Sequence, residues 1–214
     1  MGLTHTPRVI AAIARGLLRR RGATEEAVKQ GTGIGIHNPH IYQARAGLLD
    51  VDYLGHLNNA AYLSNAELAR WELTAYNGLM KSMLHDKVSF LVTSSVIRYR
   101  REIRPIFRKF QIDSAVVGLT DKHILFSQNF RYPRPADDRV KAQILLKGAA
   151  VKGRTILDPR VYFKEIGYDT ELIDSLSMPH DNESDRMDDM FTHYDALEEA
   201  LRYAADDDDK DRTS

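Results

Sequence analysis

The stretch Asp50–Trp71 reads DVDYLGHLNNAAYLSNAELARW and joins a short polar segment to an apolar one. The polar half contains Asp52 and His56 and is interrupted by Gly55, a residue type that is common in tight turns. We therefore expect a turn that presents a carboxylate and an imidazole beside the element that follows.

The apolar half predicts a helix that begins at Asn58 or Asn59 and ends near Asn77. An Asn side chain at the N-cap accepts a hydrogen bond from the free backbone N–H groups of the first turn. Gly78 suits the left-handed conformation that follows a last helical turn. The N-terminus of such a helix offers unpaired N–H donors and the positive end of the helix dipole, which stabilise a developing negative charge.

The predicted helix is apolar on most of its sides rather than along one stripe. Its apolar residues are Ala60, Ala61, Leu63, Ala66, Leu68, Ala69, Trp71, Leu73 and Ala75. A helix of this kind is normally enclosed by other structure. Its small residues suit close approach by a curved sheet, and we expect Trp71 to belong to the core.

Segments rich in β-branched residues, with polar turns between them, predict strands on both sides of this helix. They are Ile41–Leu49, Val88–Tyr99, Ile106–Leu119, His123–Tyr132 and Arg139–Lys152. Asp158–Ile166 predicts a short strand or turn, and Tyr168–Leu176 and Phe191–Ala205 predict helices.

The pattern D-x-x-G-H-x-N-N-x-x-Y, residues 52–62, is followed by Glu-Leu-Ala-Arg at residues 67–70. It resembles the hotdog-fold acyl-CoA thioesterases related to 4-hydroxybenzoyl-CoA thioesterase. The run RYRREIRPIF, residues 98–107, is similar to the branch called thioesterase superfamily member six. The resemblance covers roughly Ile41–Ile166. It implies an α+β hotdog fold, in which an antiparallel β-sheet wraps around a central α-helix.

The resemblance also implies a site. Related thioesterases carry an essential aspartate at the position of Asp52, which would attack the thioester directly or activate a water molecule. His56 would contact the carbonyl oxygen or steer the water, and N–H groups near Asn58 and Asn59 would polarise the carbonyl. Two structural alternatives stay open: an aspartate that only ties the turn together, and a histidine that fills the core or caps the helix.

Three further residues bear on this site. Leu54 stands where plant acyl carrier protein thioesterases have an Asn, and a leucine cannot orient a carboxylate or a water molecule. This departure weakens the case for activity without affecting the fold. Glu67 and Arg70 lie three residues apart on the predicted helix, so we expect a structural ion pair between them.

A basic cluster follows the second predicted strand. It comprises Arg98, Arg100, Arg101 and Arg104, with Arg108 and Lys109 beyond them. One interpretation is a binding site for the phosphates of coenzyme A. The alternatives are a partner contact or a solvated edge. Nucleic acid is not expected, because few aromatic residues are interleaved with the cluster and the whole chain is electrically neutral.

The composition excludes several kinds of site. The 214 residues suit one domain with tails, and they contain 30 basic and 30 acidic residues but no cysteine. A disulfide framework, a thiol nucleophile and a thiolate metal site are therefore ruled out. No apolar run reaches the roughly 20 residues of a membrane span. We expect no cofactor and no metal.

The two ends of the chain differ in charge. Pro7–Arg21 contains no acidic residue and predicts a basic amphipathic helix, suited to mitochondrial targeting, to a membrane surface or to a docking partner. We expect it to be retained rather than cleaved. After residue 180 acidic residues predominate, and they include the run Asp206–Asp209. His37 and His40 are expected to be linker residues, since no third ligand follows at metal-site spacing.

The predicted organisation has three parts. Residues 1–40 form a basic helix with a Gly-rich linker, 41–166 the hotdog domain, and 167–214 a helical, acidic extension. The first functional hypothesis is an acyl-CoA thioesterase that dimerises edge to edge through its sheet. The second is a catalytically inactive hotdog module in a larger assembly, held by its charged extensions. We expect a mitochondrial location, with the cytoplasm or an endomembrane surface as alternatives.

Overall fold

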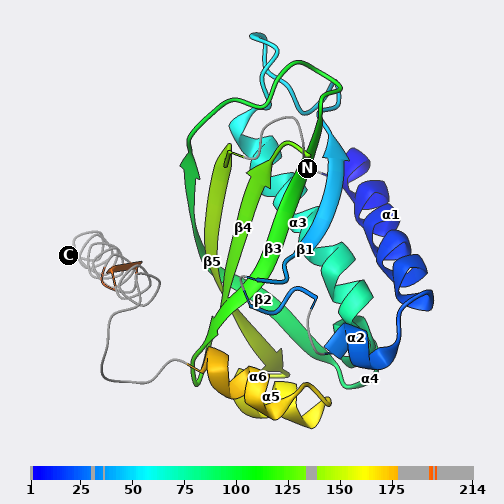
Figure 1. The fold of residues 1–214 in the computed structure, drawn as a ribbon, viewed down its shortest axis with the longest axis vertical. Helices are drawn as coiled ribbons and strands as arrows, with labels where there is room; N and C mark the ends of the chain where they lie inside the picture. The colour runs from blue at the N-terminus through cyan, green and yellow to red at the C-terminus, as the bar shows by residue number, and fades with distance from the viewer. Residues whose placement is uncertain are drawn as a thin grey trace, which may run out of the picture. The chain divides into compact units, whose positions relative to one another are not determined.

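The computed structural model describes residues 2–29, 32–35, 37–133, 139–177, 193, 194 and 196 (Figure 1). The chain divides into two units, Met1–Ser177 and Met178–Ser214, and the description below concerns the first. The helix predicted at Phe191–Ala205 and the acidic run Asp206–Asp209 lie outside the described residues, apart from residues 193, 194 and 196.

One antiparallel sheet and the helices around it make up the first unit. The helices are α1 (Gly2–Arg21), α2 (Glu25–Lys29), α3 (Asn59–Asn77), α4 (Leu79–His85), α5 (Pro159–Glu165) and α6 (Thr170–Leu176). The strands are β1 (His40–Arg45), β2 (Val88–Tyr99), β3 (Lys109–Leu119), β4 (Ile124–Arg131), β5 (Ala142–Lys152) and β6 (Thr155–Leu157). The sheet order is β1-β3-β4-β5-β2, and β6 pairs with β5.

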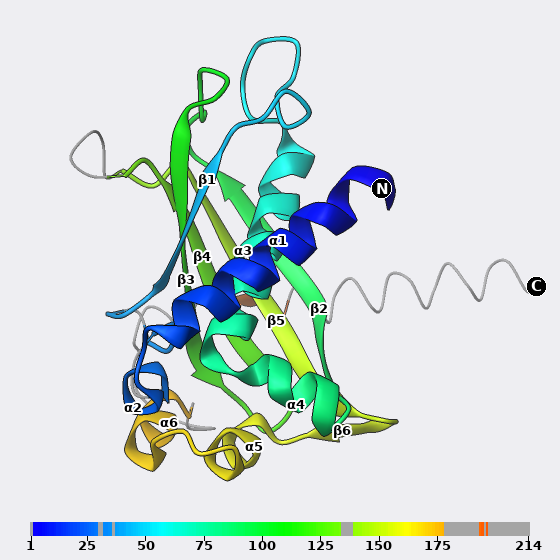
Figure 2. The same ribbon diagram turned by 90° about the vertical axis from the view of Figure 1, so that its right-hand side faces the viewer.

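Helix α3 is the central helix, and its ends are the predicted ones. Asn58 is the N-cap, with its side-chain oxygen accepting from the N–H of Ala61 at 2.8 Å. Gly78 ends the helix with φ +89°. Both flanks of α3 are covered: Ala66 and Ala69 are fully buried in the main core, together with sheet residues. Figures 1 and 2 show the curled sheet around α3, which confirms the hotdog architecture.

Helix α1 covers the side of α3 that faces away from the sheet (Figure 2). The two helices approach closely at Gly16, where an added Cβ would overlap the carbonyl oxygen of Glu72 and lie 2.8 Å from the Cβ of Ala75. The outward face of α1 carries apolar side chains, with Ile10 and Leu18 each 62% exposed. None of the helices in the described residues has the length and hydropathy of a membrane span.

A polar cluster joins α1, α3 and β1. Glu72 of α3 is 3% exposed, and its carboxylate lies 3.2 Å from Nε of Arg15 and 2.7 Å from Nη1 of Arg19. His40 is fully buried, and its Nε2 lies 3.3 Å from Oε1 of Glu72. The expectation that His40 is a linker residue is therefore wrong: it begins β1, where it pairs with Ser114 of β3.

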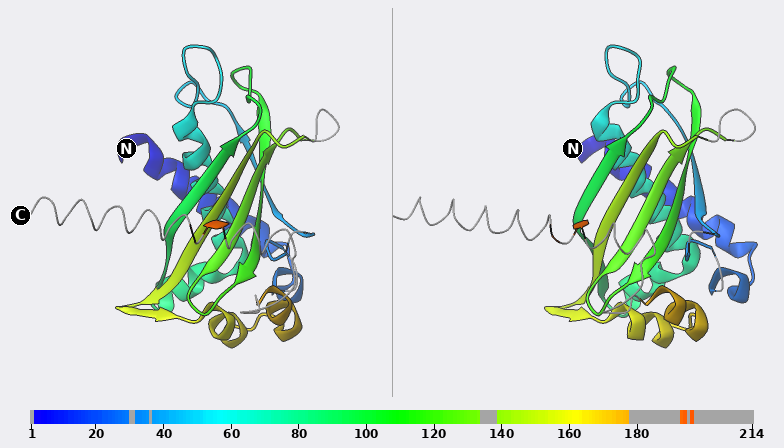
Figure 3. Two further views of the ribbon diagram at one scale, coloured as in Figure 1. Left: turned by 90° about the vertical axis from the view of Figure 1, so that its left-hand side faces the viewer. Right: turned by 60° about the vertical axis from the view of Figure 1, so that its left-hand side comes forward.

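Helices α5 and α6 lie at the end of the sheet opposite the turn that contains residues 50–58 (Figure 3). Phe163, Tyr168 and Ile173 pack against β3 and β4 residues in a second core cluster. The strand or turn predicted for Asp158–Ile166 is instead helix α5, because Asp158 caps the helix and Pro159 occupies its first position. The helix predicted at Tyr168–Leu176 is confirmed as α6.

Candidate active site

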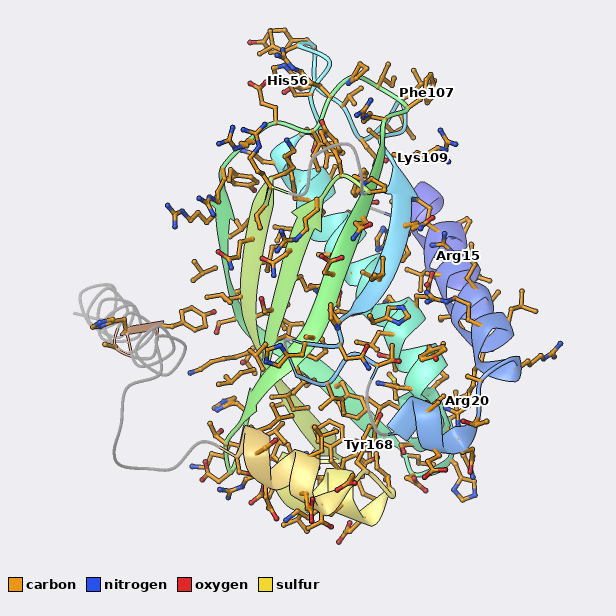
Figure 4. The ribbon with its side chains drawn as sticks, viewed as in Figure 1. Arg15, Arg20, His56, Phe107, Lys109 and Tyr168 are labelled. Carbon is orange, nitrogen blue, oxygen red and sulfur yellow. The ribbon has the colours of Figure 1, made fainter. Side chains whose placement is uncertain are left out.

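The turn before α3 is fixed by its own backbone. Val51 and Leu57 form an antiparallel bridge, and the N–H of Asp52 donates to the carbonyl of His56 at 2.8 Å. Gly55 reverses the chain with φ +76°, a conformation that side chains disfavour. The structure therefore holds Asp52 and His56 opposite each other at the base of a short loop, and Figure 4 shows His56 at the end of the molecule that carries this loop.

The Asp52 carboxylate uses one oxygen to hold this turn. Its Oδ1 accepts from the N–H of Leu54 at 2.9 Å and from the N–H of His56 at 3.1 Å. Among the described residues no donor forms a hydrogen bond with Oδ2, and Asp52 is partly exposed. One oxygen is thus held by the turn, while the other has no hydrogen-bond partner among the described residues.

His56 faces an acidic residue that the sequence did not single out. Its Nε2 lies 3.4 Å from Oε2 of Glu102, and the same oxygen lies 3.6 Å from Nε of Arg104. A carboxylate beside one imidazole nitrogen fixes the orientation of the ring. Glu102 follows the basic strand end, so its approach to His56 depends on tertiary structure.

The two asparagines have different roles. Asn58 is the cap, and its side chain and carbonyl both accept from the N–H of Ala61. Asn59 is the first helical residue, is exposed, and accepts at its carbonyl from the Tyr99 hydroxyl at 3.3 Å. The N–H groups of Asn59 and Ala60 belong to the first turn, where no intrahelical acceptor exists. These N–H groups are the polarising donors that α3 can offer.

The basic cluster lies beside the same turn. The N–H of Leu57 donates to the carbonyl of Ile103 at 3.0 Å, which joins the turn to the segment after β2. The predicted phosphate-binding residues Arg98, Arg100, Arg101 and Arg104 are all exposed. The structure therefore brings Arg101 and Arg104, which lie within two residues of Ile103, to the end of the molecule that carries Asp52 and His56.

A cavity of about 380 Å³ lies between the later turns of α3 and the sheet. The α3 residues that line it are Glu67, Arg70, Trp71, Leu73, Thr74 and Asn77. Facing them are mostly apolar residues of the sheet, such as Phe90, Val116, Phe126 and Leu146. The walls also include Leu91 and Val92, which are 52% and 49% exposed on β2, so the cavity reaches that edge of the sheet.

None of the predicted catalytic residues lines this cavity. An aromatic group formed by Tyr62, Tyr99 and Phe130 packs against the first turns of α3, with ring centroids 5.0 and 5.2 Å from that of Tyr62. Burial raises the pKa of Tyr62 to about 12, which keeps its hydroxyl neutral. In the sheet, Tyr99 and Phe130 pair with Ala142, whereas the cavity begins at Leu146. The aromatic group therefore separates the turn from the cavity.

Trp71 packs against the core, as predicted, and it also lines the cavity. The predicted ion pair between Glu67 and Arg70 is wrong. Glu67 and Arg70 have other hydrogen-bond partners: Glu67 pairs with His5 of α1 at 3.1 Å, and Arg70 donates to Gln128 of β4 at 2.7 Å. These partners lie far away in sequence, which is why helical spacing alone gave the wrong pair. Glu67 is the one acidic residue among the described residues that line the cavity.

The described residues contain no group of three or more His, Asp or Glu side chains that could hold a metal ion.

Comparisons with known proteins agree with this architecture. Residues 46–159 match the family model of the thioesterase-like superfamily. The protein THEM6 of Xenopus laevis is 29% identical over 127 residues, covering 59% of this chain and 56% of that protein. THEM6 of Drosophila melanogaster is 35% identical over 82 residues, covering 38% and 42%. The chain spans about half the length of the curated relatives it matches.

The solved structures include similar folds. The probable thioesterase YbaW of Escherichia coli superposes with a TM-score of 0.53 at 25% sequence identity. The superposition covers 58% of this chain and 93% of that one. Together with the curled sheet around α3, these findings establish that the chain belongs to the thioesterase-like superfamily and has its hotdog fold.

Proposed function

We propose that this protein hydrolyses acyl-CoA thioesters at the turn that precedes α3, with Asp52 as nucleophile or general base. The observation that carries this proposal is the Asp52 carboxylate, whose Oδ1 is held by two N–H groups while Oδ2 accepts no hydrogen bond from the described residues. A carboxylate fixed beside a helix N-terminus combines a base with donors for an oxyanion.

Thioester hydrolysis at Asp52 has two routes, one with Asp52 as general base and one with Asp52 as nucleophile. As general base, Asp52 takes a proton from water while the water oxygen attacks the thioester carbon. The carbon–sulfur bond then breaks, the proton passes to the thiolate, and the products are a carboxylic acid and free coenzyme A. As nucleophile, Asp52 forms a mixed anhydride and releases coenzyme A as a thiolate. Water then hydrolyses the anhydride, and the proton freed in that step protonates the thiolate. His56 orients the water or contacts the carbonyl oxygen in either case.

An acyl-CoA substrate would contact both the arginines near the turn and the cavity along α3. The exposed arginines Arg100, Arg101 and Arg104 lie at the end of the molecule with the turn, where they suit the phosphates of coenzyme A. The apolar cavity along α3 suits the acyl chain. Glu67, its first α3 residue, lies eight positions after Asn59, or roughly 12 Å along the helix axis. An acyl chain that reaches the cavity must therefore pass the aromatic group.

We also propose a homodimer through β2. This strand is an edge of the sheet, and Leu91, Val92 and Val96 expose apolar side chains on it. Exposed apolar edges are normally covered, and a second copy here would close the cavity where it reaches the edge. Light scattering should give the dimer mass for the native protein and the monomer mass for Val96→Lys. Leu84→Lys, on the exposed α4, should leave the dimer intact; a native monomer would contradict the proposal.

A catalytically inactive hotdog module in a larger assembly is the second candidate. It is favoured by two observations: Asp52 ties the turn through local hydrogen bonds, and it does not line the cavity along α3. Thiol release from a panel of acyl-CoAs separates the candidates. Release by the native protein that falls at least about a hundredfold in Asp52→Ala, with unchanged circular dichroism, supports hydrolysis. No release by either protein supports the inactive module.

The outward face of α1 supports a proposal about its surroundings. Residues 7–21 turn Arg8, Arg15 and Arg19 toward the protein, while Ile10 and Leu18 are exposed. We propose that this face contacts a membrane surface, as a mitochondrial location would allow. The native protein should sediment with anionic vesicles, and an Ile10→Asp/Leu18→Asp variant should not. Equal sedimentation of both proteins would contradict the contact.

A further inference from the structure

The cavity along α3 contains a positive charge that the proposed hydrolysis does not use. Arg70 lines the cavity from α3, opposite apolar side chains such as Phe126 and Leu146. Burial lowers the pKa of Arg70 to about 10, against the opposing effect of nearby Glu67. The guanidinium thus remains charged at neutral pH but has lost much of its hydration, and a desolvated cation is costly unless it is paired.

A buried network fixes the orientation of this guanidinium. Its Nη1 donates to Oε1 of Gln128 at 2.7 Å. Gln128 is fully buried, and its amide nitrogen donates to the carbonyl of Ala66 and to Oγ of Ser114, both at 3.0 Å. The amide therefore has to present its oxygen to Arg70. This contact occupies one of the several N–H donors that a guanidinium carries.

The nearby carboxylate of Glu67 does not form an ion pair with Arg70. Oε2 of Glu67 lies 3.1 Å from Nε2 of His5, and Oε1 accepts from the indole N–H of Trp71 at 3.3 Å. Both oxygens of Glu67 therefore have other partners. Across the part of the chain that the structure describes, no carboxylate lies within ion-pair distance of Arg70.

We propose that the cavity binds an aliphatic carboxylate, with the chain against the apolar wall and the carboxylate on Arg70. A planar carboxylate matches the planar fork of guanidinium donors. Arg70 is the only cationic residue among the described residues that line the cavity, so a singly charged group fits better than a phosphate. The volume of about 380 Å³ is within the range of small-molecule sites.

Two sources of such an aliphatic carboxylate fit the cavity. The first is a free fatty acid, whose only carboxylate would lie at Arg70. The second is a dicarboxylic acyl thioester, which would reach Arg70 with its far carboxylate. Arg70 lies eleven positions after Asn59, the first residue of α3, so this carboxylate would sit roughly 16 Å along the helix from the turn. Only the second source rests on the proposed hydrolysis.

The single tryptophan of the chain gives a direct test of binding, because Trp71 lines the cavity. Its fluorescence should be titrated with dodecanoate and with dodecanol, which share one chain and differ in charge. We expect dodecanoate to bind about tenfold more tightly, as a charge-assisted hydrogen-bonded pair allows. Arg70→Met should remove this preference by weakening only dodecanoate. Arg154→Met, the same change at an exposed turn, should preserve it.

Equal affinity for the two ligands in the native protein would overturn the proposal, as would an unchanged preference in Arg70→Met. If Arg70→Met does not fold, Arg70→Lys keeps the charge without the planar fork, and its preference should fall without vanishing; an undiminished preference would overturn the role of the fork. Thiol release then separates the sources. Faster release from dodecanedioyl-CoA than from dodecanoyl-CoA, lost in the Arg70 variant, assigns the dicarboxylic thioester. Equal thiol release from the two thioesters, or no release from either, assigns the free fatty acid as the ligand. The absence of release would contradict the proposed hydrolysis but not the binding of a carboxylate at Arg70.

Discussion

Arg8 of α1 and Asp50 form a two-point ion pair, with Nη1 2.9 Å from Oδ1 and Nη2 3.3 Å from Oδ2. Asp50 is 6% exposed, also accepts from the N–H of Gly47, and precedes the candidate catalytic aspartate by two residues. Nη2 of Arg8 reaches Asn65 of α3 as well, at 3.0 Å. The first helix thus holds the turn that carries Asp52.

Removing this pair should destabilise the protein and the turn together. Arg8→Met leaves a buried carboxylate with one partner fewer, and we expect a loss of about 2 kcal/mol in the free energy of unfolding. Urea denaturation measures the loss. In a double-mutant cycle with Asp50→Asn, the two single losses should not add. Additive losses would show that the ion pair does not couple α1 to the turn.

The close contact between α1 and α3 should not tolerate a larger side chain at Gly16. Gly16→Ala places a methyl group against the carbonyl of Glu72 and the side chain of Ala75, so we expect a loss of about 1–3 kcal/mol. Gly22→Ala is the matched control, because the nearest atom to its added Cβ is the Arg19 carbonyl oxygen at 3.8 Å. Thermal unfolding of both variants checks this, and equal midpoints would contradict the close approach.

Glu72 should make the protein less stable in acid. Burial acts to raise the pKa of Glu72, but His40, Arg19 and Arg15 outweigh it and lower the pKa below its usual value. The unfolded state therefore takes up this proton first as the pH falls. The stability is present above about pH 4.3, the ordinary value for Glu, and is lost as the pH drops through the lower folded value.

Urea denaturation between neutral pH and pH 3 measures this effect. The native protein should lose stability over that acidic range, and Glu72→Gln should show a shallower loss from a lower starting stability. Glu171→Gln is the control, since Glu171 is exposed at the start of α6. Parallel curves for the native protein and Glu72→Gln would contradict the account.

The sequence predicted what local chemistry determines. Asn58 and Gly78 mark the ends of α3, and Val88–Tyr99 is β2 with the predicted bounds. Helix α5 was missed although Asp158 and Pro159 form a helix start, because the apolar residues after them also suit a strand. Local signals at Asp52 and His56 likewise predicted a polar turn, which the structure contains.

The rest of the site depends on contacts between distant residues. Glu102 reaches His56 only because the segment after β2 pairs with the turn. The cavity arises from the register of β2, β4 and β5 against α3, which no spacing within one segment reveals. His40 became a core residue because its strand lies beneath Glu72, whereas its Asn-Pro neighbours in the sequence indicated a linker.

Two carboxylates are candidates for the catalytic role, Asp52 in the turn and Glu67 in the cavity, and replacing each by its isosteric amide distinguishes them. Thiol release from dodecanoyl-CoA should be measured for the native protein, Asp52→Asn and Glu67→Gln. We expect kcat to fall about a hundredfold or more in Asp52→Asn. Glu67→Gln should stay within about tenfold of the native rate. An active Asp52→Asn beside an inactive Glu67→Gln would contradict the account and move the chemistry into the cavity.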